Sequence, residues 1–205
     1  METKIIDSAN KIEKKPFWKV FTIAIVIELI LMLLIFFLDK RPCPSEEYSL
    51  KWMQAVQLLL VAFLAFKIYK INQGKIKSFW ALVAIAFSWA TLDELFMIHE
   101  RIADNWLSNT LLNSIYPYPL DSFVIAIYFV IGIVFLVYFI KPLYNEYRGE
   151  KWPYILIFAI LIHAYSALAD VMSWSCSEEY AEAFAELFYL LSFALAYLKH
   201  RKNEQ

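Results

Sequence analysis

Ionisable side chains interrupt the most apolar stretches of this sequence, at positions where a charge is costly. Residues 78–106 read SFWALVAIAFSWATLDELFMIHERIADNW, an apolar segment that ends in a dense polar group. This group consists of Asp93, Glu94, His99, Glu100 and Arg101. An ionisable group at the centre of a membrane span costs about 2.5–3.5 kcal/mol, so those that persist usually face a protein interior and have partners.

Further ionisable groups occur in three other apolar segments. They are Glu28, His163, Asp170, Glu182 and Glu186. Residues seven apart differ by only about 20° around a helix, because each residue turns it by about 100°. Asp93 and Glu100 therefore share one helical face, and His163 and Asp170 share another. The depths of these residues within their segments predict that three helices direct acids into the same half of one bundle.

A group of four or more carboxylates in a pocket of low polarity cannot remain charged and unpaired. Either several of them carry protons or a cation lies among them. Helical bundles do build metal sites from inward-pointing glutamates and histidines, and carboxylate with imidazole suits zinc, manganese or iron. The predicted ligands of a divalent metal ion are Asp93, His163, Asp170 and Glu186.

A metal site of this kind predicts hydrolase-like chemistry on a lipid or another membrane-soluble substrate. A metal-bound water would be the nucleophile. Glu94 is the first candidate for the catalytic acid or base, because a partly buried glutamate can be tuned toward neutral pH. Neither a G-x-S-x-G nor an H-E-x-x-H motif is present to support a better-defined class of hydrolase.

Most of these residues also have a purely structural interpretation. Glu182 fits a solvated acidic start of a helix, where negative charge is favourable. Glu100 fits an ordinary charge cluster at the membrane interface. His99 lies about 120° from the face of Asp93 if the helix is continuous, which favours an interfacial histidine over a ligand. His163 fits a structural pair with Glu28 across the bundle.

Two other functions compete with the metal site. The first is proton or cation translocation along Glu28, His163, Asp93, Glu94 and Glu186. The second is a role as an accessory subunit of a larger membrane complex, or as a homo-oligomer. Transporters with alternating access commonly use helices broken by glycine or proline. Here Gly132 is the one glycine within a predicted span, and the prolines fall in predicted loops or at helix ends, which argues against large rocking motions.

The elements that must position these side chains are transmembrane helices. The chain is 61% hydrophobic and 19% charged, whereas soluble domains average about 45–50% and 25%. Six apolar segments are long enough to cross a hydrocarbon core of about 30 Å. They are Phe17–Leu38, Trp52–Ile71, Phe79–Ile98, Phe123–Ile140, Trp152–Met172 and Glu182–Leu198. The sequence therefore predicts an all-α integral membrane protein with a bundle of six transmembrane helices.

The lysines and arginines predict the orientation of this bundle. Most of the 19 basic residues fall at the N-terminus, in the second and fourth loops and at the C-terminus. Such an excess marks the cytoplasmic side. We therefore expect a cytoplasmic lead over residues 1–16, a transmembrane domain over 17–198, a cytoplasmic tail over 199–205 and a site that faces outward from the plasma (inner) membrane.

Two smaller patterns complete the prediction. The segments Trp52–Ile71 and Phe123–Ile140 carry no ionisable group in their interiors, which favours lipid-facing walls. Basic runs interleaved with aromatic residues do not occur outside the spans, so we expect membrane lipid and not nucleic acid as a partner.

Cys43 and Cys176 fall in two loops on the predicted external side. An oxidising compartment there favours a structural disulfide between them. The alternative is a pair of free thiols.

Overall fold

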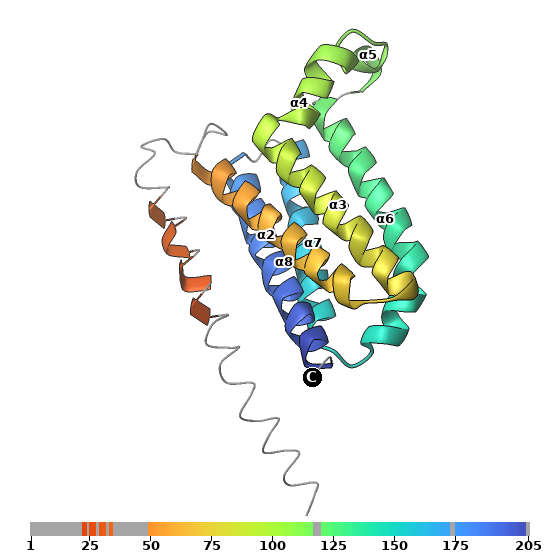
Figure 1. Cartoon of the computed structure of the whole chain (residues 1–205). Helices are drawn as coiled ribbons and strands as arrows, with labels where there is room; N and C mark the ends of the chain where they lie inside the picture. The colour runs from red at the N-terminus through yellow and green to blue at the C-terminus, as the bar shows by residue number, and fades with distance from the viewer. Residues whose placement is uncertain are drawn as a thin grey trace, which may run out of the picture. The chain divides into compact units, whose positions relative to one another are not determined.

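The computed structural model describes residues 22–23, 25–27, 29–31, 33–34, 49–116, 120–172 and 175–203. The chain divides into two compact units, residues 1–42 and 43–205. In the first unit the described residues are helical. The second unit contains helices α2 to α8 (Figure 1).

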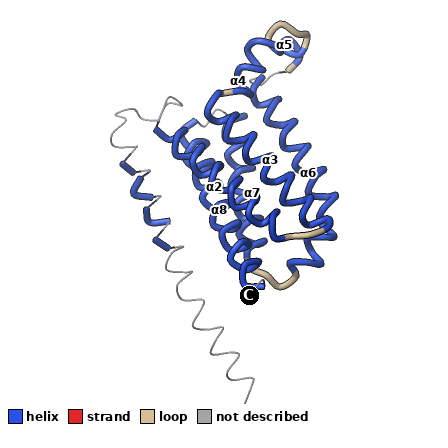
Figure 2. The backbone as a smooth tube through the Cα atoms, viewed as in Figure 1, coloured by secondary structure: helices blue, strands red, loops and turns tan. Residues whose placement is uncertain are grey.

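The second unit is built from helices joined by turns, as Figure 2 shows. Its elements are α2 (Ser49–Ile71), α3 (Gly74–Phe96), α4 (Ile98–Ile102), the π-helical turn η1 (Ala103–Leu107), α5 (Leu112–Ile115), α6 (Leu120–Tyr147), α7 (Trp152–Val171) and α8 (Ser175–Asn203). Five of the described helices, α2, α3, α6, α7 and α8, are long and apolar enough to cross a membrane. They support the predicted all-α, multi-pass class. Most of the sixth predicted span, Phe17–Leu38, lies outside the described residues.

Helix α2 packs one of its faces against α3 and α8. Its buried residues recur every three or four positions, and Gln54, Val61, Ala65 and Ile68 are fully buried. The expectation that this segment forms a lipid-facing wall therefore holds for one face of the helix, where Leu59 and Phe63 are exposed, while the small and amide side chains turn inward. Helix α6 does match that expectation, since more than half of the residues in the predicted span Phe123–Ile140 are exposed.

An aromatic cluster closes the end of the bundle at which α8 finishes. Trp80 at its centre is completely buried, and its ring meets those of Tyr147, Trp152 and Phe193 at centroid distances of 6.4, 5.7 and 5.2 Å. The indole N–H of Trp80 donates to the Tyr147 hydroxyl at 2.8 Å. That hydroxyl lies 2.9 Å from Nε2 of His200. The cluster thereby joins α3, α6, α7 and α8 through buried contacts.

The opposite end of the bundle begins with a break in the chain after α3. Met97 has φ 52° and ψ 48°, a left-handed conformation that ends one helix before α4 starts. Its N–H bonds to the carbonyl of Asp93. The predicted span Phe79–Ile98 is thus not one continuous helix to its end. Helix α6 differs from prediction in the other direction, because it continues past Ile140 to Tyr147 and includes Pro142.

Candidate functional site

A cavity of about 900 Å³ lies between the helices of the second unit, and we call it the central cavity. Helices α2, α3, α6, α7 and α8 form its walls, while α4, η1 and α5 contribute residues at the end where α3 stops and α8 starts. We call this end the acidic end. Ten carboxylates line the cavity: Asp93, Glu94, Glu100, Asp104, Asp121, Asp170, Glu178, Glu179, Glu182 and Glu186. In the same described lining, the basic side chains are Lys51, His99 and His163.

Asp93 and His99 form a dyad because the chain breaks between them. The carboxylate of Asp93 accepts the backbone N–H of His99 through Oδ1 at 2.8 Å. Its Oδ2 lies 3.0 Å from Nδ1 of the same histidine. In a continuous helix the two side chains would point about 120° apart, so the left-handed Met97 creates the pair. Asp93 thereby caps the start of α4.

The dyad continues to Glu100 and Lys51 at the mouth of the cavity. Nε2 of His99 lies 4.0 Å from Oε1 of Glu100, and Nζ of Lys51 lies 3.6 Å from the same oxygen. Burial lowers the pKa of His99, but the hydrogen bond and charge of Asp93, with the charges of Glu100 and Glu94, outweigh burial and raise this pKa above 6.5. The histidine therefore holds a proton more readily than it would in solution.

A second polar group surrounds Glu182 of α8. Nε2 of Gln54 on α2 donates to Oε2 of Glu182 at 3.3 Å. Nε2 of His163 on α7 lies 4.0 Å from the other carboxylate oxygen, Oε1. Nδ1 of His163 is buried without a hydrogen-bond partner among the described residues. Glu182 therefore connects three helices within one site.

Glu94 lies between the two polar groups. It interacts electrostatically with Glu182 and Glu179 of α8, with Lys51 of α2 and with His99. The side chain is half-buried and lines the cavity. Two carboxylates of α8 thus face one carboxylate of α3, and a cation between them would relieve their mutual repulsion.

Glu186 lies one turn deeper on α8 and is 1% exposed. It lines the cavity and interacts electrostatically with Tyr189 in the next turn. The Tyr189 ring lies 6.0 Å from the His163 ring. Asp170 of α7 also lines the cavity. The acidic lining therefore reaches from the mouth to a buried level of the bundle.

The structure distributes the predicted metal ligands differently from the prediction. Asp93 pairs with His99, while His163 lies beside Glu182. Among the described residues, no three histidine, cysteine or acidic side chains converge in a geometry that can hold a metal ion. Asp93, His163, Asp170 and Glu186 all line the central cavity. Glu28, Cys43 and the side chain of Cys176 lie outside the described residues, and the predicted disulfide with them.

The sequence analysis missed Gln54 and Lys51, because it looked for groups of ionisable residues within the apolar segments. Gln54 is neutral, and Lys51 precedes the segment Trp52–Ile71. Gln54 and Gln57 lie three positions apart in an apolar segment and are both buried. Two amides on one face of a span are a signal that the face turns toward protein, since lipid offers them no partners. That pattern identifies the inner face of α2 from the sequence.

Comparison with known proteins gives the family of this chain. Searches among curated proteins and among solved structures find no significant match. A family model described as a domain of unknown function, DUF8692, matches residues 20–196. The match spans most of the chain and includes every described residue of the central cavity. The chain therefore belongs to the DUF8692 family.

Proposed function

We propose that this membrane protein binds an amphiphilic cation in its central cavity, with the charged head among the acids and the apolar body against the deeper walls. The observation that carries the proposal is the composition of the described lining, in which ten carboxylates face one lysine and two histidines. A protonated or permanently charged amine is the ligand whose charge complements this lining.

The apolar part of the lining explains why the ligand is amphiphilic. Aromatic and aliphatic side chains line the cavity away from the acidic end; Phe79, Phe87, Phe135, Leu136 and Phe193 are among them. A cavity of about 900 Å³ has the size of a small-molecule site. Apolar surface from the ligand is removed from water there at a gain of about 25 cal/mol per Å².

Within the acidic end, Glu94 and Glu182 are the proposed anchors of the cationic head. They approach from facing helices, α3 and α8. Gln54 holds one oxygen of Glu182, and His163 lies close to the other. The distribution of lysines and arginines supports placing this end on the external side.

A divalent metal ion is the second candidate for the same carboxylates. It is favoured by one contact, the approach of His163 to Glu182 with Glu94 in electrostatic range. Imidazole and carboxylate are ligands of zinc, manganese and iron. With such an ion bound, Glu94 would take the acid–base role in hydrolysis of a lipid. Assembly of that site requires the side chains to move from their present pairs.

The test measures binding of tritiated tetraphenylphosphonium, an apolar cation, to the full chain in nanodiscs. Triphenylphosphine oxide, which is neutral and similarly apolar, is the competitor. The variant is Glu94→Gln with Glu182→Gln. The matched control is Glu146→Gln with Glu150→Gln, which removes the same charge at the far end of the bundle. A unit charge at 4 Å contributes about 1–4 kcal/mol, so we expect the site variant to lose at least about tenfold in affinity.

Elemental mass spectrometry of the same samples separates the two candidates. Saturable cation binding in the wild type and the control, with loss in the site variant and no effect of the neutral competitor, supports the amphiphile. Near-stoichiometric zinc, manganese or iron that disappears in the site variant, with no binding of tetraphenylphosphonium, supports the metal and overturns the amphiphile. If the wild type, the site variant and the control bind tetraphenylphosphonium equally and also have equal metal content, both candidates are overturned.

A further inference from the structure

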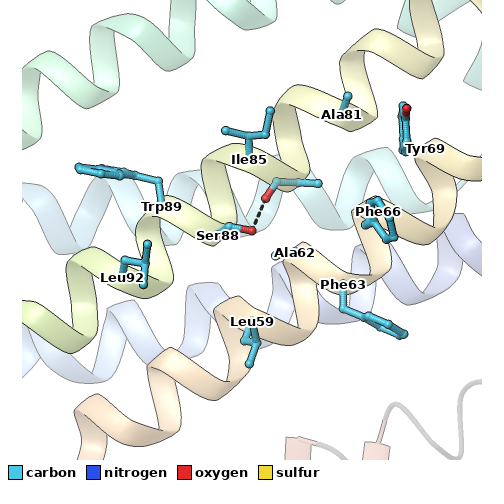
Figure 3. A pocket seen from close by; sticks show the side chains of 11 residues that line it. Leu59, Ala62, Phe63, Phe66, Tyr69, Ala81, Ile85, Ser88, Trp89 and Leu92 are labelled. Atoms are coloured by element: carbon cyan, nitrogen blue, oxygen red, sulfur yellow. Dashed lines mark hydrogen bonds between the residues drawn. The ribbon is translucent and has the colours of Figure 1, made fainter.

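A second pocket lies on the outside of the hairpin formed by α2 and α3 (Figure 3). Its volume is about 720 Å³. Leu59, Phe63, Phe66 and Tyr69 line it from α2, while Ala81, Ile85, Trp89 and Leu92 are among those that line it from α3. We call it the hairpin groove. It is separate from the central cavity, with which it shares no lining residue.

The hairpin groove is apolar along most of its length. Ser88 is the one hydroxyl-bearing aliphatic side chain of its lining, and it donates to the carbonyl of Ala84 in its own helix at 2.8 Å (Figure 3). A hydroxyl satisfied in this way needs no polar ligand. The walls therefore suit a hydrocarbon chain.

Three lysines lie over the aromatic wall of this groove. Nζ of Lys67 is 5.1 Å from the ring centroid of Phe63, and Nζ of Lys70 is 4.8 Å from that of Phe66. From the other helix, Nζ of Lys77 is 5.0 Å from the ring centroid of Tyr69. All three rings line the groove. The groove is thus bordered by positive charge at the end near the turn between α2 and α3.

These ammonium groups have no carboxylate partner among the described residues. They lie over the three rings, and neither α2 nor α3 contains an acidic residue before Asp93. An ammonium over an aromatic face gains about 0.5–1 kcal/mol at an exposed site. That gain does not exceed the roughly 1 kcal/mol that a lysine gains near an anionic membrane surface, so an anionic ligand can recruit all three.

The length of the groove matches one leaflet of a membrane. Its lining runs along α2 from Tyr69 to Leu59, which corresponds to about 15 Å at a rise of 1.5 Å per residue. Along α3 it runs from Ala81 to Leu92, or about 16 Å. The hydrocarbon core of a bilayer is about 30 Å thick. An acyl chain whose headgroup lies at the turn end would therefore fill the groove.

We propose that the hairpin groove binds an anionic phospholipid, with an acyl chain along Phe63 and Phe66 and the phosphate headgroup at Lys67, Lys70 and Lys77. The chemical class follows from charge complementarity, since an uncharged or zwitterionic lipid leaves the three lysines without a counter-ion. This site is independent of the central cavity and holds whether or not the cavity binds a cation.

Native mass spectrometry of the full chain, with phosphatidylglycerol and phosphatidylcholine in equal amounts, tests the proposal. The variant is Lys67→Gln, Lys70→Gln and Lys77→Gln. The matched control is Lys75→Gln, Lys141→Gln and Lys151→Gln, three exposed lysines that neither border the groove nor line it. A lysine near an anionic lipid surface contributes roughly fivefold in affinity, so three contribute on the order of a hundredfold.

The wild type and the control are expected to retain one phosphatidylglycerol, and the groove variant is expected to bind both lipids alike. No preference in the wild type, or an unchanged preference in the groove variant, overturns the proposal.

Photocrosslinking gives a second measurement that does not depend on removing charge. Benzoylphenylalanine at Ile85, within the groove, is compared with the same probe at Leu82, which is exposed on the same helix outside the groove. We expect phosphatidylglycerol to be enriched over its bulk fraction at Ile85 only. Capture of peptide instead of lipid at Ile85 shows that a protein segment fills the groove and overturns the proposal.

Discussion

A substitution of Asp93 can separate the effect of its negative charge on His99 from the effect of its hydrogen bond to the start of α4. Asparagine caps a helix about as well as aspartate, so Asp93→Asn retains an acceptor for the backbone N–H of His99. It removes the negative charge that faces Nδ1 of the histidine at 3.0 Å. The side chains are 13% and 19% exposed, so solvent screens the pair only in part. A hydrogen bond to a charged group contributes about 1.5–3 kcal/mol, and we expect a loss of about 1–2 kcal/mol for the charge alone.

The sign of the pH dependence follows from the raised pKa of His99. Its stabilising contribution is complete below the unfolded pKa of 6.5 and is lost as pH rises through the folded pKa. Asp93→Asn should therefore destabilise the protein by about 1–2 kcal/mol at pH 6, and by less at pH 9, where a larger share of the histidine has lost its proton.

The assay is unfolding in sodium dodecyl sulfate, followed by circular dichroism at pH 6 and pH 9. Asp104→Asn, which removes an exposed carboxylate from the same cavity mouth, is the control. NMR titration of the histidines in parallel should show a fall in the pKa of His99 in Asp93→Asn. An equal loss of stability at both pH values, or an unchanged pKa of His99, would refute the reasoning.

Three further substitutions probe other parts of the bundle, each through the unfolding midpoint. Trp80→Phe should cost about 2–3 kcal/mol, because it leaves the Tyr147 hydroxyl without its buried donor and opens a void; a loss below 1 kcal/mol would contradict the role of the cluster. Gly149→Ala should cost about 1 kcal/mol, because φ is +87° there although a Cβ would meet no atom; no change would count against this. Lys51→Met should lower the free energy of unfolding by less than about 1 kcal/mol, because it removes a partly exposed ion pair with Glu100. A larger decrease would show that Lys51 stabilises further carboxylates.

The spans were the most predictable part of the fold, because burial in lipid imposes a length and an apolar composition on each helix. Five predicted segments correspond to α2, α3, α6, α7 and α8. Their inner faces were harder to predict. An apolar segment looks alike whether it meets lipid or protein, and for α2 the buried Gln54 and Gln57 carried the missing information.

The candidate site was predictable as a set of residues but not as a set of pairs. The acids of residues 93–100 and 178–186 do line one cavity, as their depth in the spans indicated. Their pairing depends on Met97, whose left-handed backbone conformation is rare for residues other than glycine. Helical periodicity assumes that such a break is absent, so it placed His99 away from Asp93. A single backbone angle therefore decided which partners met.

The aromatic cluster around Trp80 has a consequence for where the bundle can open. At that end four helices are joined by buried rings and by hydrogen bonds from Trp80 through Tyr147 to His200. At the acidic end, by contrast, each of the cited contacts involves an ionisable group, at distances of 3.3 to 4.0 Å. Protonation or a bound cation changes such contacts directly, whereas it leaves interlocked rings unaffected. The acidic end of α3 can therefore move away from α7 and α8, which follow each other in the chain at that end, where α7 ends at Val171 and α8 begins at Ser175. Backbone amides near Glu182 should exchange with deuterium sooner than those near Phe193.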